Sequence, residues 1–219
     1  MKKLEEGIQL FNQTEYEKAI IVLSEFLLSN PNHADALYYR GISLRKVNRF
    51  NESIDDFNAI LIKLPDEPTL LCERAISLFK NQQINLAMND LDRAVILDSK
   101  NPFRYTSRAF IRANIDIDGA ISDYQKAIEL DPSDEIAYNN LGLLQEQRGN
   151  YKEAKKSFDK SNQIIGYKPE NRLDSSTSKV LEEKIDTENL NTWNIIKGVF
   201  TSNKIRNEYF GYIANFFKN

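Results

Sequence analysis

The sequence predicts an all-α solenoid in which helix-turn-helix units stack along the chain. A small residue recurs at a constant interval that shortens by one position only at its last step, as Gly7, Gly41, Ala75, Ala109 and Gly142. A second small residue recurs with it, as Ala19, Ser53, Ala87, Ala120 and Ala154. Four positions after each of these comes a large side chain, namely Leu23, Phe57, Leu91, Tyr124 or Phe158. Prolines follow the helical patterns of units one, two and four, where their fixed φ ends a helix (Pro31, Pro65 and Pro132).

Each recurring column has a physical role. The small residues let the two helices of one unit approach closely, and the large residues fill the space between neighbouring units. Because no unit can bury its apolar face alone, stacking of neighbours creates a continuous core. The units predicted in this way are 1–33, 34–67, 68–101, 102–134 and 135–168.

Two units depart from the pattern. The fourth is one residue short between Ala109 and Ala120. Since turns tolerate deletions better than helices, we place the deletion in the turn at 114–118 and expect both helices to be intact. The fifth unit carries polar or small residues where earlier units have apolar residues or proline, at Gln145, Ser161 and Gly166. This composition predicts that the repeat ends there.

The fifth unit is also the most characteristic in sequence. It contains Ala-Tyr-Asn-Asn-Leu-Gly at 137–142, then Gly-Asn-Tyr at 149–151, and then Ala154 and Phe158. This spacing resembles the tetratricopeptide repeat (TPR), a helix-turn-helix unit of about 34 residues. The resemblance implies a right-handed superhelix of about five repeats. It also implies a concave face, built from the first helices, that holds a segment of a partner protein.

That geometry, carried over residue by residue, places a set of largely apolar and aromatic side chains in the groove. The predicted protein-binding residues are Tyr38, Tyr39, Ile42, Arg45, Ile76, Phe79, Phe103, Phe110, Asn139 and Asn140. An exposed apolar stripe of this size indicates a surface that another segment covers. Any one of these residues could instead face a neighbouring helix.

One subclass of the family is excluded by its motif. TPR domains that bind chaperones hold the C-terminal carboxylate of the partner with Lys and Asn four positions apart in one first helix, Asn in the next, and Lys and Arg in a third. In this chain the corresponding positions of units one to three hold Leu4 and Ile8, then Tyr39, then Thr69 and Glu73. The sequence therefore does not resemble the carboxylate-clamp type.

Beyond the repeats the composition changes. Residues 169–191 are polar and read as a linker with a short helical stripe. Residues 192–219 have apolar residues spaced by three and four, and four basic residues against one acidic residue give a charge of about +3. The expected packing residues of this tail are Trp193, Ile196, Phe200, Tyr209, Ile213 and Phe216. The sequence leaves open whether the tail caps the last repeat, fills the groove, self-associates or binds a membrane surface.

Catalytic and cofactor motifs are absent. The sequence has no nucleotide-binding glycine motif and no HExxH. One histidine and one cysteine cannot form the usual zinc sets, so we expect no metal, no cofactor and no enzymatic activity. His33 is interpreted as a solvated turn residue and Cys72 as a packing residue.

The remaining composition is also compatible with an interaction protein. The net charge of −3 and the scattered basic residues argue against nucleic-acid binding. No signal peptide is visible, and no apolar run is long enough to suggest a transmembrane helix, so we expect a soluble, cytoplasmic protein. The predicted function is a non-enzymatic scaffold that binds an apolar or helical segment of another protein. The alternative is an assembly factor that acts at a membrane surface, or by self-association, through its tail.

Overall fold

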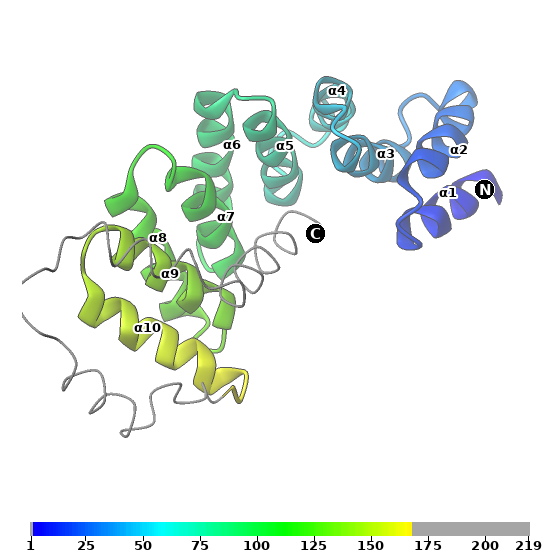
Figure 1. The fold of residues 1–219 in the computed structure, drawn as a ribbon. Coiled ribbons are helices and arrows are strands. Elements are labelled where there is room, and N and C mark those ends of the chain that lie inside the picture. The colour runs from blue at the N-terminus through cyan, green and yellow to red at the C-terminus, as the bar shows by residue number, and fades with distance from the viewer. Residues whose placement is uncertain (1, 168–219) are drawn as a thin grey trace, which may run out of the picture. The chain divides into compact units, whose positions relative to one another are not determined.

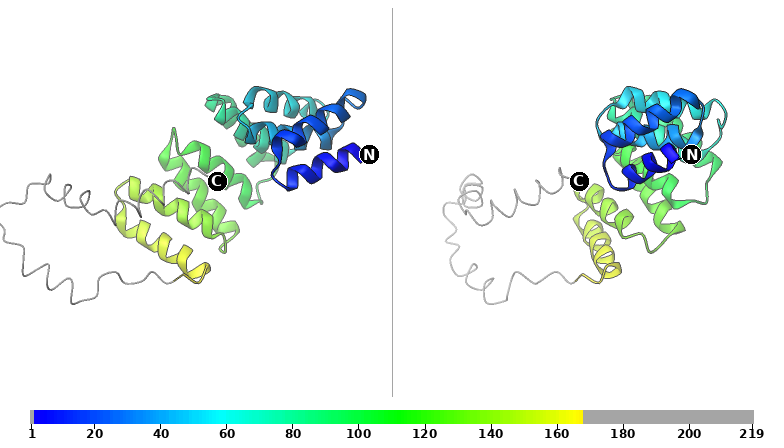
Figure 2. Two further views of the ribbon diagram at one scale, coloured as in Figure 1. Left: turned by 45° about the vertical axis from the view of Figure 1, so that its right-hand side comes forward. Right: turned by 90° about the vertical axis from the view of Figure 1, so that its right-hand side faces the viewer.

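The computed structural model of the protein describes residues 2–167, which form ten α-helices and no strand (Figure 1). The helices are α1 (Lys2–Asn12), α2 (Tyr16–Ser29), α3 (Ala34–Lys46), α4 (Phe50–Leu61), α5 (Pro68–Lys80), α6 (Ile84–Leu97), α7 (Pro102–Arg112), α8 (Ile117–Leu130), α9 (Glu135–Gln147) and α10 (Tyr151–Ile164). The two helices of each repeat lie side by side, and each second helix packs on the first helix of the next repeat (Figure 2). The prediction of an all-α solenoid is confirmed.

Close contact between the helices of one repeat explains the column of small residues. A Cβ atom added to Gly142 would lie 2.6 Å from Cε1 of Phe158. The same addition to Gly7 would place it 2.6 Å from Cγ of Leu23. In these two repeats the large residue of the second helix therefore occupies the space that a side chain on the first helix would need.

The turn inside four of the repeats has a common backbone conformation. Its middle residue has a positive φ, of 61° at Thr14, 63° at Asn48, 61° at Gln82 and 80° at Gly149. In the second repeat, the backbone N–H of Arg49 then donates to the carbonyl of Leu44 at 2.8 Å. This arrangement satisfies a carbonyl at the end of the first helix, as in other left-handed helix C-caps.

Repeat four is built differently, and the prediction of a shortened turn with intact helices was wrong. Helix α7 has 11 residues, whereas α5 and α9 have 13. Arg112 stands where repeats two and three have a buried leucine, and its Nε donates to Asp116 at 3.0 Å. Asp116 in turn accepts from the N–H of Gly119 at 2.9 Å and caps α8. Side-chain contacts thus close this turn in place of a residue with positive φ.

Side chains cap the first helices of repeats two to five. Asp134 Oδ1 accepts from the N–H of Ala137 at 2.8 Å, and Asn101 and Glu67 cap α7 and α5 in the same way. His33 caps α3 and packs edge to face on Phe26. His33 does lie in the connection between α2 and α3, but the interpretation as a solvated turn residue was incomplete, since the residue is partly buried and its ring accepts a hydrogen bond.

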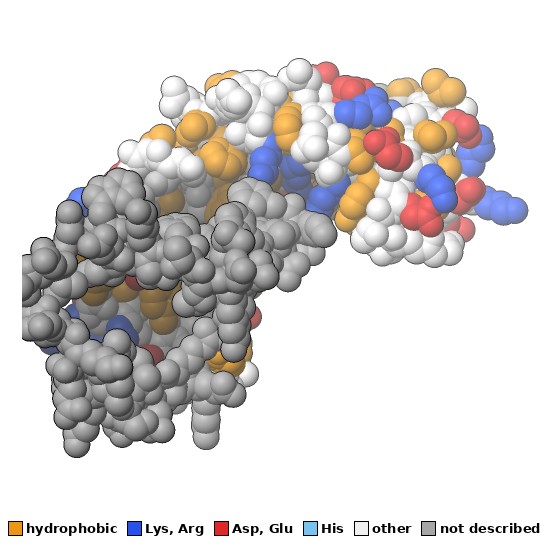
Figure 3. All heavy atoms as spheres, viewed as in Figure 1, with side chains coloured by type: hydrophobic (Ala, Val, Ile, Leu, Met, Phe, Trp, Pro, Cys, Tyr) orange, Lys and Arg blue, Asp and Glu red, His pale blue; other side chains and the backbone are white. Residues whose placement is uncertain are grey.

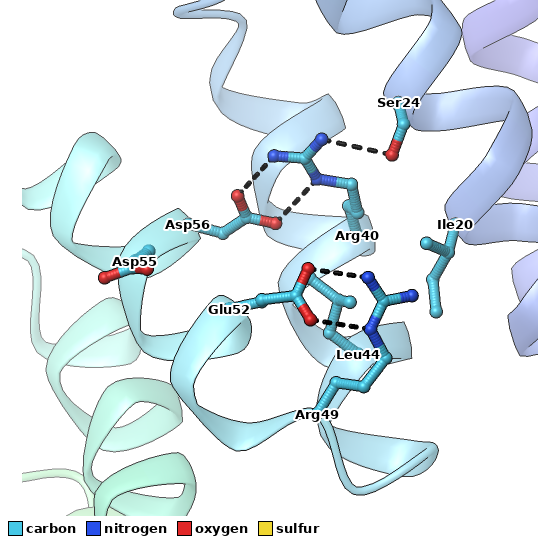
Figure 4. Close-up of a pocket in the computed structure, with 8 residues that line it drawn as sticks. All are labelled: Ile20, Ser24, Arg40, Leu44, Arg49, Glu52, Asp55 and Asp56. Carbon is cyan, nitrogen blue, oxygen red and sulfur yellow. Dashed lines mark hydrogen bonds and ion pairs between the residues drawn. The ribbon is translucent and has the colours of Figure 1, made fainter.

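Three arginines at equivalent positions of repeats two, three and four join neighbouring repeats. The guanidinium of Arg40 donates to both carboxylate oxygens of Asp56, at 2.9 and 2.6 Å, and to Ser24 Oγ of the preceding repeat at 3.1 Å (Figure 4). The same arrangement recurs as Arg74 with Asp90 and Asn58, and as Arg108 with Asp123 and Asp92. We call this set the arginine ladder. It has no counterpart in repeat five, where Leu141 and Ser157 take the places of the pair.

The surface of the described repeats is mixed in character. Hydrophobic, basic and acidic side chains are interspersed on the face of the N-terminal repeats turned to the viewer in Figure 3. Between residues 2 and 167, no helix has both the length and the apolar character needed to cross a bilayer. The predicted linker and tail, with Trp193, Ile196, Phe200, Tyr209, Ile213 and Phe216, lie outside the described residues.

Candidate functional site

An apolar pocket of about 320 Å³ opens among the first helices α5, α7 and α9. We call it the groove pocket. Most of its surface is contributed by aliphatic and aromatic side chains, with a few polar groups among them. Its lining residues are Ile76, Phe103, Thr106, Ser107, Phe110, Tyr124, Asp134, Ile136 and Asn140.

Helix α7 supplies the aromatic wall of the groove pocket. Phe103 and Phe110 are separated along the chain by about two helical turns, so their side chains lie on one face of α7. They are 53% and 55% exposed, which is unusual for phenylalanine. The ring of Phe79 on α5 packs edge to face on Phe110, with the centroids 6.1 Å apart. Phe79 therefore extends the apolar wall beyond the pocket itself.

Polar groups of the groove pocket lie mainly on the α8 and α9 side. Tyr124 is buried, and this burial raises the pKa of its hydroxyl to about 12, against an opposing hydrogen bond with Asn140. Among the lining residues within 2–167, Asp134 is the one that carries a charge. The described lining can therefore offer apolar surface, hydrogen-bonding groups and one carboxylate to a ligand.

The N-terminal half of the predicted groove is filled by its own side chains. The prediction that Ile42 lies on an open binding surface was wrong, because this residue is only 9% exposed and belongs to the main core. Tyr39 packs edge to face on both Phe11 and Tyr38, with centroid separations of 5.1 and 5.5 Å. Tyr38 also packs on Phe57, and burial raises its pKa above the ordinary value.

Arg45 is likewise engaged within the protein. Its guanidinium donates to the carboxylate of Glu73 at 2.6 Å and to the backbone carbonyl of Glu73 at 2.8 Å. The side chains of both residues are largely buried. This contact links α3 to α5 and leaves Arg45 less available to a partner than its position in the sequence predicts.

The structure thus divides the predicted groove residues. Ile76, Phe103, Phe110 and Asn140 line the groove pocket and Phe79 adjoins it, whereas Asn139 is exposed on α9 outside the lining. The others, Tyr38, Tyr39, Ile42 and Arg45, lie in the filled half.

The other five lining residues are not in the predicted set. Thr106, Ser107 and Ile136 lie on the first helices α7 and α9, whereas Tyr124 on α8 and Asp134, the N-cap of α9, lie outside the helices from which the groove was predicted. Asp134 stands directly before a helical pattern in the sequence. An aspartate at this position is a helix N-cap signal, which could have placed it at the N-terminus of α9.

Cys72, the single cysteine of the chain, is buried in the protein interior and contacts a buried arginine. Cys72 is 1% exposed, and burial raises its thiol pKa, although Arg104 Nη1 approaches its Sγ at 3.7 Å and opposes the shift. Arg104 is itself buried between repeats three and four, where it donates to Asp98 and Thr69. Within residues 2–167, no three His, Cys, Asp or Glu side chains are placed to hold a metal ion.

Comparison with known proteins agrees with this architecture. Models of the tetratricopeptide repeat match residues 4–68 and 136–165, and a model described as TPR repeat matches residues 116–149. A search of curated proteins found no match.

Solved structures of similar fold include a crystal structure of MamA (22% identity, TM-score 0.64, covering 73% of this chain and 94% of that one). Another is residues 41 to the end of MamA from Desulfovibrio magneticus RS-1 (20%, 0.63, covering 75% and 96%). A third is YrrB, described as a TPR protein with an unusual peptide-binding site (24%, 0.58, covering 82% and 91%). The ten paired helices, the recurring columns and these matches together show that the chain is a tetratricopeptide repeat protein.

Proposed function

We propose that the protein is a non-enzymatic interaction scaffold that binds an apolar or helical segment of a partner protein in the groove pocket. Scaffolding of protein–protein contacts is the general role of TPR proteins, and a peptide-binding site is named for YrrB. The proposal extends to a scaffold at 1–168, a linker at 169–191 and a tail at 192–219. It also includes a cytoplasmic location.

The exposure of Phe103 and Phe110 is the observation that carries the proposal. More than half of each side chain is open to solvent, and both border one cavity with Ile76 and Ile136. A cavity of this volume lies within the usual range for ligand sites, and its mostly apolar lining is typical of them. Apolar surface that is contiguous and exposed in this way indicates an interaction site.

A pair of double variants tests the site. We expect Phe79→Ala with Phe110→Ala to lose a partner that the wild type captures from a host lysate, because two of the three rings of the aromatic wall are removed. The matched control is Leu28→Ala with Ile96→Ala, which removes exposed aliphatic side chains from the second helices α2 and α6. This control should retain the partner.

The assignment of the groove is wrong if the Phe79/Phe110 variant retains every captured protein while its circular dichroism matches that of the wild type. It is also wrong if the control variant loses the same proteins to the same extent, since the loss would then reflect any removal of apolar surface.

A further inference from the structure

We propose that the groove pocket selects a segment in which a large apolar side chain lies beside a lysine or arginine, with the cation bound by Asp134. This inference rests on the proposed function, because it specifies the partner chemistry of the same site. The two claims fail separately in the experiment below.

The charge of the lining is the first argument. In the part of the chain that the structure describes, the lining residues include the acidic Asp134 and no basic residue. The three arginines of α7 are engaged elsewhere: Arg104 binds Asp98, Thr69 and Cys72, Arg108 binds Asp123 and Asp92, and Arg112 binds Asp116 and Asp123. The carboxylate at the pocket is therefore not neutralised by an arginine of the helix that forms the aromatic wall.

The position of Asp134 is the second argument. Its Oδ1 accepts from the N–H of Ala137, its carbonyl accepts from the N–H of Tyr138 at 3.2 Å, and its own N–H donates to the carbonyl of Asp131 at 3.3 Å. These contacts fix the carboxylate before any ligand arrives. A carboxylate offers about four acceptor positions, so one capping bond leaves capacity for an incoming ammonium or guanidinium.

The neighbours of Asp134 are the third argument. Ile136 follows closely in the chain, and Ile76 and Phe103 line the same cavity. A ligand that reaches the carboxylate therefore also meets apolar surface. The aliphatic stem of lysine or arginine can lie along such surface while its charged end meets the carboxylate. An anionic group, such as the C-terminal carboxylate of a peptide, would be repelled at the same position.

The test is a selection of random dodecapeptides, displayed on phage, against three immobilised full-length proteins. These are the wild type, Asp134→Asn, and Asp131→Asn. Asparagine is as effective a helix N-cap as aspartate, so Asp134→Asn removes the charge while keeping the cap of α9. Asp131 lies in the same turn and binds Ser133 but does not line the pocket, which makes Asp131→Asn the matched control.

We expect the wild type and Asp131→Asn to enrich peptides with an aromatic or large aliphatic residue next to Lys or Arg. Asp134→Asn should enrich the apolar residue without the basic one. For a selected peptide, replacement of its Lys by Gln should weaken binding to the wild type roughly two- to fivefold, the range expected of a partly exposed ion pair. The affinities of the Lys and Gln peptides are compared by fluorescence anisotropy. The two peptides should bind Asp134→Asn equally well, and their difference in affinity for the wild type should become smaller at high salt.

Enrichment of apolar residues without Lys or Arg by the wild type would overturn this inference and leave the proposed function in place. The inference would also be overturned if Asp134→Asn enriched Lys and Arg as strongly as the wild type does, or if the wild type enriched acidic residues. If the wild type enriches no apolar residue, and Phe79→Ala with Phe110→Ala selects the same peptides, the proposed function fails and the inference fails with it.

Discussion

The rings of Phe79 and Phe110 meet edge to face across repeats three and four, with their planes inclined at 75°. This contact joins α5 to α7 at the groove and gives the aromatic wall a fixed shape. The same two side chains thus contribute to the packing of neighbouring repeats and to the surface that we propose as the binding site.

The aromatic contact should be measurable as a coupling energy. Phe79→Ala, Phe110→Ala and the double variant form a cycle, and edge-to-face aromatic pairs typically couple by about 0.5–1.5 kcal/mol beyond their burial. The free energy of unfolding is measured with urea for each variant. We expect the sum of the losses in the two single variants to exceed the loss in the double variant by about this amount. Strictly additive losses would show that the two rings do not stabilise one another.

Gly142→Ala should destabilise the last repeat. The new methyl group would lie 2.6 Å from Phe158, and overpacking of this kind typically costs about 1–3 kcal/mol. Thermal unfolding followed by circular dichroism should show a lower midpoint. Gly142→Ala combined with Phe158→Leu should recover part of the loss, because a leucine leaves more room opposite the methyl group. A double variant less stable than Gly142→Ala would contradict the assigned clash.

The arginine ladder should contribute more to stability than the exposed ion pairs. Arg74→Ala leaves Asp90, a largely buried carboxylate, without its paired donor, and loss of one partner from a buried pair costs on the order of 3 kcal/mol. Glu129→Gln, which breaks the exposed pair with Lys126, should cost less than about 1 kcal/mol. Urea unfolding compares the two variants directly. Equal losses would mean that the ladder is no more than a set of surface contacts.

Asp98 should make the contact between repeats three and four sensitive to acid. Hydrogen bonds from Arg104 and Asn101 hold its pKa below the ordinary value of 3.8. The unfolded chain then binds this proton at a higher pH than the folded protein does. The stabilisation is complete above the ordinary pKa of the unfolded chain and is lost as the pH falls through the lower folded pKa.

NMR titration of the Asp98 carboxyl carbon should therefore give a midpoint below 3.8. The difference in stability between the wild type and Asp98→Asn should be largest near neutral pH and should shrink in acid. A difference that stays constant from neutral pH to roughly pH 3 would contradict the proposed linkage.

Much of the scaffold could be predicted because the determining signals are local. The columns of small and large residues recur with the repeat, and each helix is specified by its own apolar spacing and by the prolines and caps at its ends. The construction of repeat four was missed for the opposite reason. Its turn depends on Arg112 reaching Asp116, a side-chain contact that the length of the deletion does not reveal.

The arginine ladder was also overlooked, although its regular spacing, one arginine to a repeat, is visible in the sequence. Charged residues at regular intervals usually indicate a solvated helix face. Asp56 and Asp123 are instead 4% exposed, and each carboxylate is paired with the ladder arginine on the adjacent helix of its repeat. Burial of this kind depends on neighbours that are far away in sequence.

The groove shows most clearly which properties of a residue the sequence determines and which depend on the tertiary structure. Ile42, Ile76 and Phe110 occupy one column of consecutive repeats, so the sequence assigns all three to the same face. Ile42 is nonetheless buried, Ile76 is half-buried and Phe110 is more than half exposed. Periodicity alone cannot distinguish them.

The sequence by itself determined the repeat period, the helices and the face on which a groove forms, because these follow from local spacing. Only the tertiary structure decided which half of that face is open. Tyr39 packs against the core cluster that contains Ile42, whereas the same column holds the smaller Ser107 and Asn140 in repeats four and five, and both line the groove pocket. Exposure depends on the volume of the side chains that the next helix brings alongside.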